Sequence, residues 1–244
     1  MNAATPTAAT GEGFVDGARA CLPTLLGYLS IGFSAGAVAW IAGLQTAEVA
    51  LMSLLVYAGS GQFVLASMFS SHASMASIWI AVFIVNLRHV LMSSYISTLC
   101  SGMSATRGVA VGAQLTDETF GVAAVQGQRT GRLALHWMLG LNLTAYLGWL
   151  VGNVAGAGAS SLLPQPLIAG LGFALVAMFI GLVVLQLMGS PDRLAQALAG
   201  LLSMALLMPA KAIMGPSFGV IVASMAACTV ALGVGRWTSA RTSR

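Results

Sequence analysis

Two long stretches of this sequence contain no charged residue. No Lys, Arg, Asp or Glu occurs between Glu48 and Arg88, and none occurs between Arg132 and Asp192. Charged side chains make up only 7% of the 244 residues and hydrophobic ones 58%, whereas a soluble domain usually carries about 25% charged residues. The chain therefore lacks the polar side chains needed to cover a water-facing surface. The sequence predicts an all-α polytopic membrane protein.

Apolar segments of spanning length give about seven transmembrane helices. A helix that crosses the hydrocarbon needs about 20 apolar residues. By this criterion the predicted helices cover residues 21–43, 49–70, 74–99, 133–156, 166–188, 194–210 and 213–235. We expect residues 1–20 to be a disordered tail, 21–235 a single transmembrane transport domain, and 236–244 a basic cytoplasmic tail. The polar segment 101–132 is predicted to be a loop with a short amphipathic helix around Thr119–Val125.

Basic residues predict how the helices are oriented. With seven spans, one side of the membrane would hold Arg107, Arg129, Arg132, Arg193, Arg236, Arg241 and Arg244. The opposite side would hold Arg19 in the N-terminal tail, with Lys211 inside the interruption that follows the sixth span. Because cytoplasmic loops carry an excess of Lys and Arg, this pattern predicts an N-terminus outside and a C-terminus in the cytoplasm.

The second predicted helix is interrupted near its middle. Within Leu51–Met68 (LMSLLVYAGSGQFVLASM), the segment Ala58–Gln62 contains two glycines and a serine, which lower helix propensity. Backbone that unwinds at membrane depth needs protein or a water-filled cavity around it, and in transporters such breaks often bind solutes and ions. A second interruption is predicted at Pro209–Pro216, because proline removes a backbone donor. The seven predicted helices can be divided into two groups of three, separated by the fourth helix. An interruption in the second helix of each group would suit such a 3+1+3 inverted repeat.

Small residues recur at every fourth position of the fourth predicted helix. They are Thr144, Gly148, Gly152, Gly156 and Ser160. A ridge of this kind lets two helix backbones approach closely. It indicates either packing inside the protein or docking of a second membrane subunit.

The interrupted helix supplies most of the candidate substrate-binding residues. The complete set is Tyr57, Gly59, Ser60, Gly61, Gln62, Asn86 and Arg88. Unpaired N–H groups and the positive dipole end of a broken helix could bind a carboxylate. Alternatively, the glycines line a helix crossing and the Gln62 amide bonds to backbone.

Arg88 lies near the middle of the third predicted helix, where an arginine costs about 2.5–3.5 kcal/mol on insertion scales. It could clamp a substrate carboxylate with its planar guanidinium, or pair with Asp117 or Glu118. His89 could relay protons, or could be a structural histidine. We expect His89, Asp117 and Glu118 to serve in coupling or ion pairing, although both acids would also suit the first turn of a helix capped by Thr116.

Three segments resemble the AzlC family in order and spacing: Glu48–Phe63 (EVALMSLLVYAGSGQF), Asn86–His89 (NLRH) and Leu115–Phe120 (LTDETF). The resemblance is dense over residues 20–150, and one departure is Gly61, where Ala or Ser is more usual. Family members are the large subunits of two-component branched-chain amino acid exporters. The resemblance therefore implies export of small aliphatic amino acids across the bacterial cytoplasmic (inner) membrane, with a small four-span membrane subunit of the AzlD type.

Two other functions compete with secondary transport. Ser60 in Ala58–Gly61 is similar to the serine of an intramembrane hydrolase, and Lys211 could carry retinal in a seven-helix protein. The sequence has no phosphate-binding GxxxxGK[ST] motif, and its three isolated cysteines lack the spacing of a metal site. We therefore expect a transporter rather than an enzyme, with no cofactor, no metal and no nucleic-acid partner.

Overall fold

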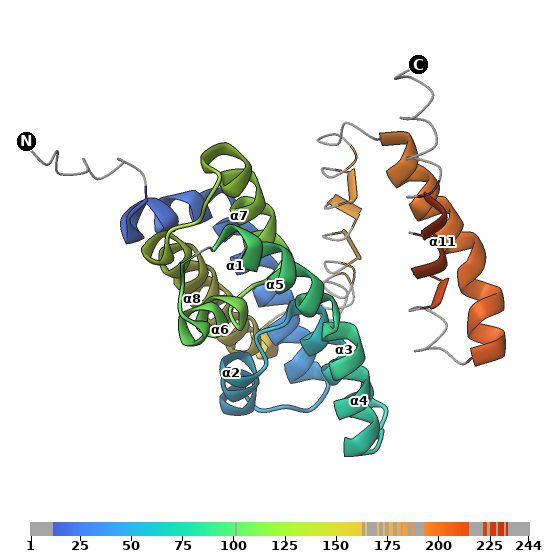
Figure 1. Ribbon diagram of the computed structural model, residues 1–244. Helices are drawn as coiled ribbons and strands as arrows, with labels where there is room; N and C mark the ends of the chain where they lie inside the picture. The colour runs from blue at the N-terminus through green and yellow to red at the C-terminus, as the bar shows by residue number, and fades with distance from the viewer. Residues whose placement is uncertain are drawn as a thin grey trace, which may run out of the picture. The chain divides into compact units, whose positions relative to one another are not determined.

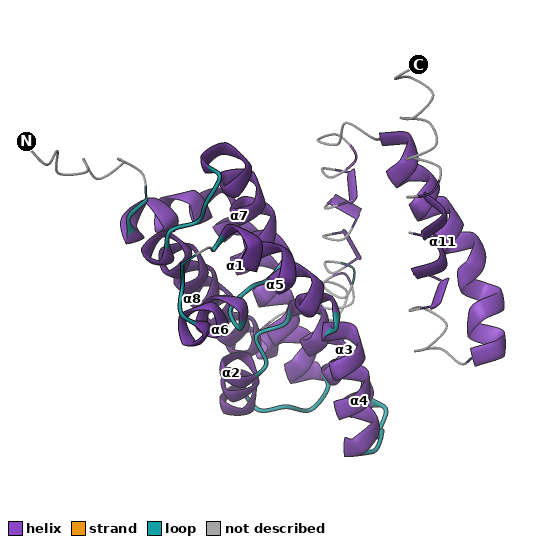
Figure 2. Cartoon of the chain, in the orientation of Figure 1, coloured by secondary structure: helices purple, strands orange, loops and turns teal. Residues whose placement is uncertain are grey.

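The computed structural model describes residues 12–100, 102–162 and 193–214, with scattered positions between 164 and 187 and between 222 and 233. The α-helices are α1 (Phe14–Ile41), α2 (Thr46–Leu55), α3 (Gly59–Ser70), α4 (Met75–Asn86), α5 (Arg88–Leu99), α6 (Ala105–Gly112), α7 (Asp117–Thr130), α8 (Leu135–Ala159) and α11 (Arg193–Met214), and a 3-10 turn, Ser160–Leu162, follows α8 (Figures 1 and 2). The chain divides into two compact units, Met1–Leu175 and Val176–Arg244. Among the described residues, four helical segments are long and apolar enough to cross a membrane: Phe14–Ile41, Met75–Leu99, Leu135–Leu162 and Gln196–Ile213. The predicted all-α polytopic membrane protein is confirmed.

The first unit is built on two parallel helices, α1 and α8, whose backbones touch. A Cβ added to Gly17 would overlap the backbone of Trp137, and a Cβ added to Gly36 would overlap that of Asn153. Gly156 stands equally close to the α1 backbone. The small-residue ridge of α8 is therefore used for packing inside the protein, the first of the two roles that the sequence left open.

Helices α2 and α3 form a hairpin that enters and leaves at one end of this pair. Val49 of α2 and Ala66 of α3 belong to one buried cluster with the C-terminal parts of α1 and α8. The connection Val56–Ala58 lies near the middle of α8, where the Tyr146 hydroxyl donates to the Leu54 carbonyl (2.8 Å). The hairpin is therefore re-entrant, and it does not cross the membrane as the predicted helix 49–70 would.

Helices α6 and α7 form a second hairpin, which enters from the opposite end. Gly127 of α7 packs against Leu99, and the Leu99 carbonyl accepts a hydrogen bond from the Leu133 amide (2.8 Å) just before α8 begins. The connection between α6 and α7, Ala113–Thr116, reaches the middle of α1, where the Thr116 and Tyr28 hydroxyls are hydrogen-bonded. The tips of the two hairpins thus meet halfway along α1 and α8.

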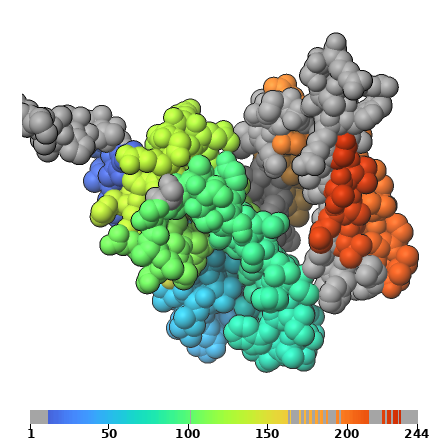
Figure 3. Space-filling model, viewed as in Figure 1, coloured from blue at the N-terminus to red at the C-terminus, as the bar shows by residue number. Residues whose placement is uncertain are grey.

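Helices α4 and α5 form one apolar segment that passes both tips. The two helices are separated only by Leu87, whose backbone also has right-handed helical dihedral angles. Most of its large side chains are exposed, among them Trp79, Phe83 and Leu91, and the segment covers much of the face of the first unit seen in Figure 3. Such a surface suits contact with lipid.

Four predicted features need correction. The first interruption is Val56–Ala58, because Gly59–Gln62 already forms the first turn of α3. Of the predicted interruption Pro209–Pro216, the part at Pro209 is absent, since α11 continues through Pro209 to Met214; residues 215–221 lie outside the described part. The connection Ala113–Thr116 is an interruption that was not predicted. Helix α7 includes the amphipathic helix expected around Thr119–Val125 and is longer, and α6 was not predicted. Helix α1 begins at Phe14, within the expected tail. Most of the predicted helices 166–188 and 213–235, and the tail 236–244, also lie outside the described residues.

The N-terminus of α1 and the basic segment after α5 lie at the same end of the first unit. Arg132 donates to the carboxylate of Glu12 at 2.9 Å. Arg19, Arg107 and Arg129 lie towards this end too, and the connections at the other end, 42–45 and 71–74, contain no Lys or Arg. The predicted placement of Arg19 opposite Arg107, Arg129 and Arg132 is wrong, because the α2–α3 hairpin does not cross the membrane.

Candidate functional site

Arg88 joins the two hairpin tips. Its Nη2 atom donates to the hydroxyl of Ser60 in the first turn of α3 (2.7 Å) and lies 3.0 Å from Oδ2 of Asp117 in the first turn of α7. The side chains of Arg88 and Asp117 are 28% and 22% exposed, so both charges are largely removed from solvent. This arrangement, which we call the Arg88 bridge, connects segments that are far apart in sequence through one guanidinium.

The electrostatics of the Arg88 bridge follow from helix direction. Both α3 and α7 begin at the bridge, so their unpaired N–H groups and positive dipole ends point towards it. Asp117 balances the guanidinium and suits the first turn of α7. Ser60 offers only a neutral hydroxyl, and the first turn of α3 contains no acid. The α3 side of the bridge is therefore the electropositive side, where a carboxylate would be stabilised.

Gln62 positions the interruption of the first hairpin. Its side-chain amide donates to the Val56 carbonyl at 2.6 Å, and its carbonyl accepts from the Trp149 indole at 3.1 Å. Gln62 is only 1% exposed. The second of the two roles foreseen for Gln62, bonding to backbone, is the one present here: its side-chain amide donates to the Val56 carbonyl, which also accepts from the Ala58 amide (2.9 Å).

The second tip is held by its capping residue. The Thr116 hydroxyl accepts from the Thr119 amide, as an N-cap residue does, and is also bonded to Tyr28 of α1. Asn142 of α8 donates to the Val111 carbonyl near the end of α6 (3.1 Å). Glu118 is within electrostatic range of the Tyr28 and Tyr57 phenols. The tip thus brings a second acid to the middle of the unit.

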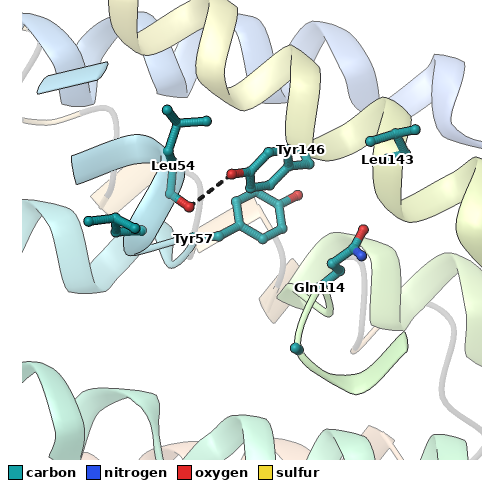
Figure 4. A pocket seen from close by; sticks show the side chains of 7 residues that line it. Leu54, Tyr57, Gln114, Leu143 and Tyr146 are labelled. Atoms are coloured by element: carbon teal, nitrogen blue, oxygen red, sulfur yellow. Dashed lines mark hydrogen bonds between the residues drawn. The ribbon is translucent and has the colours of Figure 1, made fainter. Parts of the chain in front are cut away.

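A cavity of about 350 Å³ lies beside the two tips (Figure 4). Its lining comes from the end of α2, both interruptions and α8: Leu54, Leu55, Tyr57, Ala113, Gln114, Leu143 and Tyr146. The Tyr57 and Tyr146 rings meet edge to face, with centroids 4.8 Å apart. The Tyr57 hydroxyl is buried and has no hydrogen-bond partner among the described residues.

The structure brings together three of the predicted site residues, Ser60, Arg88 and Asp117. Two others are close to the tip: Gly59 lies against the Trp149 ring, and Gly61 faces the Asn86 amide, so a larger side chain at either position would meet these groups. Whether these residues bind substrate stays a prediction.

Two of the predicted residues have local roles. His89 bonds through Nδ1 to the Asn86 carbonyl one turn earlier (3.0 Å), as a structural histidine would. Lys211 lies exposed in the last turn of α11, in the second unit, and a retinal-binding lysine would be buried. The Ser60 hydroxyl accepts a hydrogen bond from Arg88, whereas the serine of a hydrolase donates to a histidine base.

Several residues that shape the site were not among the predicted site residues. Gln114 belongs to the polar cluster 114–120, which the sequence marks, but it was not assigned to the substrate site. Leu143, Tyr146 and Trp149 lie in the long apolar run of α8 and resemble ordinary membrane-helix residues. Only the fold shows that this face of α8 meets both tips.

Replacing Gln62 with leucine should destabilise the protein. The substitution leaves the Trp149 indole without its partner and removes one of the two hydrogen bonds to the Val56 carbonyl; a buried unsatisfied group costs about 1–3 kcal/mol. We expect a lower unfolding temperature in detergent, whereas the control Gln128→Leu, at an exposed position of α7, should change it little. Equal unfolding temperatures for the two variants would show that the Gln62 amide does not hold the interruption.

Comparison with known proteins identifies the family. The family model described as AzlC protein matches residues 23–163. The chain is 32% identical to the inner membrane protein YgaZ of Escherichia coli over 193 residues, which covers 75% of this chain and 78% of that protein. It is 31% identical over 175 residues to an uncharacterized membrane protein of Archaeoglobus fulgidus, covering 71% and 75% of the two chains. An uncharacterized membrane protein of Helicobacter pylori is 27% identical over 177 residues, covering 72% and 76%. No solved structure matches the chain. The chain is therefore a membrane protein of the AzlC family.

Proposed function

We propose that this chain is the large subunit of a secondary exporter of branched-chain or other small aliphatic amino acids. The observation that carries the proposal is that the α2–α3 and α6–α7 hairpins, each interrupted at its tip, enter from opposite ends of the unit and meet at the Arg88 bridge. Interrupted helices of this kind place binding sites near the middle of the bilayer in transporters. Family membership supports a transporter-type membrane protein, and the substrate class follows from the resemblance described above.

A zwitterion suits the Arg88 bridge because it carries both of the charges that the bridge pairs. When the ion pair between Arg88 and Asp117 opens, a carboxylate can replace Asp117 at the guanidinium. The ammonium group can then replace Arg88 at Asp117 or face Glu118. Opening the pair for a solute with only one charge would leave the other protein charge unpaired, which is costly in a partly buried site.

Ion coupling would act on the same acids. Protonation of Asp117 or Glu118 changes the charge that faces the ammonium group, and His89 lies next to Arg88 along the chain. A proton gradient could therefore drive export through His89, Asp117 or Glu118. We also propose that a small AzlD-type membrane subunit completes the exporter.

Counterflow of labelled leucine in proteoliposomes tests the transport function. We expect the purified chain, alone or with a candidate small subunit, to exchange external labelled leucine for internal unlabelled leucine. Comparing the two preparations shows whether the partner is needed. A serine-directed hydrolase probe that labelled Ser60, together with absent counterflow in both preparations, would instead favour the hydrolase alternative.

The proposed exporter has its N-terminus in the cytoplasm. Arg19, Arg107, Arg129 and Arg132 lie towards one end of the first unit, and cytoplasmic loops carry the excess of Lys and Arg. A cysteine introduced at Thr10 should therefore react with a membrane-impermeant maleimide only after cells are opened, and one at Ala73, between α3 and α4, should react in intact cells. These labels should be read in a background lacking the native cysteines, and the reverse labelling pattern would contradict this orientation. The cytoplasmic C-terminus stays a prediction.

A further inference from the structure

The cavity beside the hairpin tips is open to the surface and combines apolar with polar lining. Leu54, Leu55, Leu143 and Ala113 form its aliphatic side and are themselves exposed, Tyr57, Gln114 and Tyr146 supply polar groups, and none of its lining residues is charged. Binding pockets for small molecules usually have volumes of about 300–1,000 Å³, so a cavity of about 350 Å³ suits only a small solute or part of one.

The two tyrosine hydroxyls beside the cavity differ in their hydrogen-bond partners. The Tyr146 hydroxyl is used by the Leu54 carbonyl (2.8 Å). The Tyr57 hydroxyl is buried without a hydrogen-bond partner among the described residues, and a buried hydroxyl in that state is destabilising. A ligand that only offered hydrocarbon, such as a lipid chain, would leave it unsatisfied. A ligand with a polar group next to its apolar part would satisfy it.

The cavity lies next to the Arg88 bridge along both tips. Tyr57 precedes Ser60 by three residues, and Gln114 precedes Asp117 by three residues. Three residues span at most about 10 Å even when fully extended. Along each tip, the backbone at the cavity lining and the backbone at the Arg88 bridge are therefore within about 10 Å of each other.

We propose that this cavity is the subsite for the substrate's aliphatic side chain, an assignment that rests on the transport function proposed above. The Tyr57 hydroxyl contacts the polar end of the substrate where the cavity meets the bridge. Leu54 and Leu143 contact the side chain, and Ala113 limits its length. Ala113, Gln114 and Leu143, none of which was predicted to bind substrate, then determine which amino acids are carried.

Two substitutions of opposite effect test the subsite. Ala113→Leu reduces the space and should lower leucine counterflow relative to alanine counterflow by about tenfold or more, because one methylene in an apolar pocket changes discrimination by about 10–200-fold. Leu143→Ala enlarges the cavity and should raise phenylalanine counterflow relative to leucine. The matched controls are Ala110→Leu on α6 and Leu147→Ala on α8, both exposed and outside the cavity lining; they should keep the wild-type order of substrates.

Binding is measured separately from transport. We measure thermal stabilisation of the detergent-purified chain by alanine, leucine and phenylalanine. Ala113→Leu should lower the stabilisation by leucine relative to alanine, and Leu143→Ala should raise the stabilisation by phenylalanine relative to leucine. Tyr57→Phe should weaken the stabilisation by all three without changing their order. Wild-type counterflow with an unchanged order in Ala113→Leu and Leu143→Ala would overturn the subsite and leave the transport function standing. If the wild type neither transports nor is stabilised by any of the three, both proposals fail. A change in co-purified lipid without a change in order would assign the cavity to lipid and overturn the subsite.

Discussion

Arg88→Ala should abolish most amino-acid efflux while the protein still reaches the membrane at normal levels. The substitution removes the group that joins α3 to α7 and leaves Asp117 without its ion-pair partner. Truncating one partner of a hydrogen-bonded buried charge pair costs about 2–5 kcal/mol. Because both side chains are partly exposed here, we expect the lower end of that range, which is still more than a tenfold loss of efflux. Efflux of labelled leucine from loaded cells, normalised to membrane protein, gives the measurement.

A double-mutant cycle separates the role of Arg88 as a partner of Asp117 from its contact with substrate. Asp117→Ala should reduce efflux as well, and the two substitutions together should cost less than the sum of their separate effects, since each removes the same pair. Arg88→Lys should restore only part of the activity, because an ammonium cannot reproduce the planar fork of a guanidinium. The control is Arg107→Ala, at an exposed position of α6. Wild-type efflux in Arg88→Ala would remove the basis of the proposed site.

Gly156→Ala should sharply reduce the amount of folded protein. A Cβ at this position would overlap the backbone of Phe33, so α1 and α8 could not keep their contact and the frame that positions both hairpins would be lost. Overpacking usually costs about 1–3 kcal/mol, and a contact between two backbones cannot be relieved by moving one side chain. We expect a lower unfolding temperature and more aggregate in size-exclusion chromatography of the detergent-purified protein.

Gly158→Ala is the matched control on the same helix. A Cβ at Gly158 meets nothing within 4 Å, and alanine has a higher helix propensity than glycine by about 1 kcal/mol. This variant should therefore be as stable as the wild type, or slightly more stable. Gly36→Ala and Gly27→Ala repeat the same comparison on α1, where Gly36 touches the Asn153 backbone and Gly27 has open space around it. If Gly156→Ala unfolds at the same temperature as Gly158→Ala, the close contact of α1 with α8 is not what stabilises the unit.

The α6–α7 hairpin shows why hydropathy alone predicts a wrong topology here. Its residues are too polar and its helices too short to satisfy a spanning criterion, so segment 101–132 is predicted to be a loop with only a short helix around Thr119–Val125. The hairpin packs against α1, α5 and α8 and does not need an apolar surface all around it. The opposite error occurred at Leu51–Met68, which is apolar enough to cross but turns back at Val56–Ala58. Hydropathy measures whether a segment tolerates lipid, and it does not report where the segment leaves the membrane.

The sequence by itself determined the class of the protein, because a chain with so few charges can fold only where its surface faces lipid. It also marked Ser60, Arg88 and Asp117 as chemically unusual, since polar groups in apolar surroundings require a partner. Only the tertiary structure decided which partners they have. Helices α3, α5 and α7 are far apart in the chain, and they meet because two hairpins from opposite ends are held against the glycine-packed α1–α8 pair. That meeting depends on close contacts between distant backbones, which the pattern of any single segment does not contain.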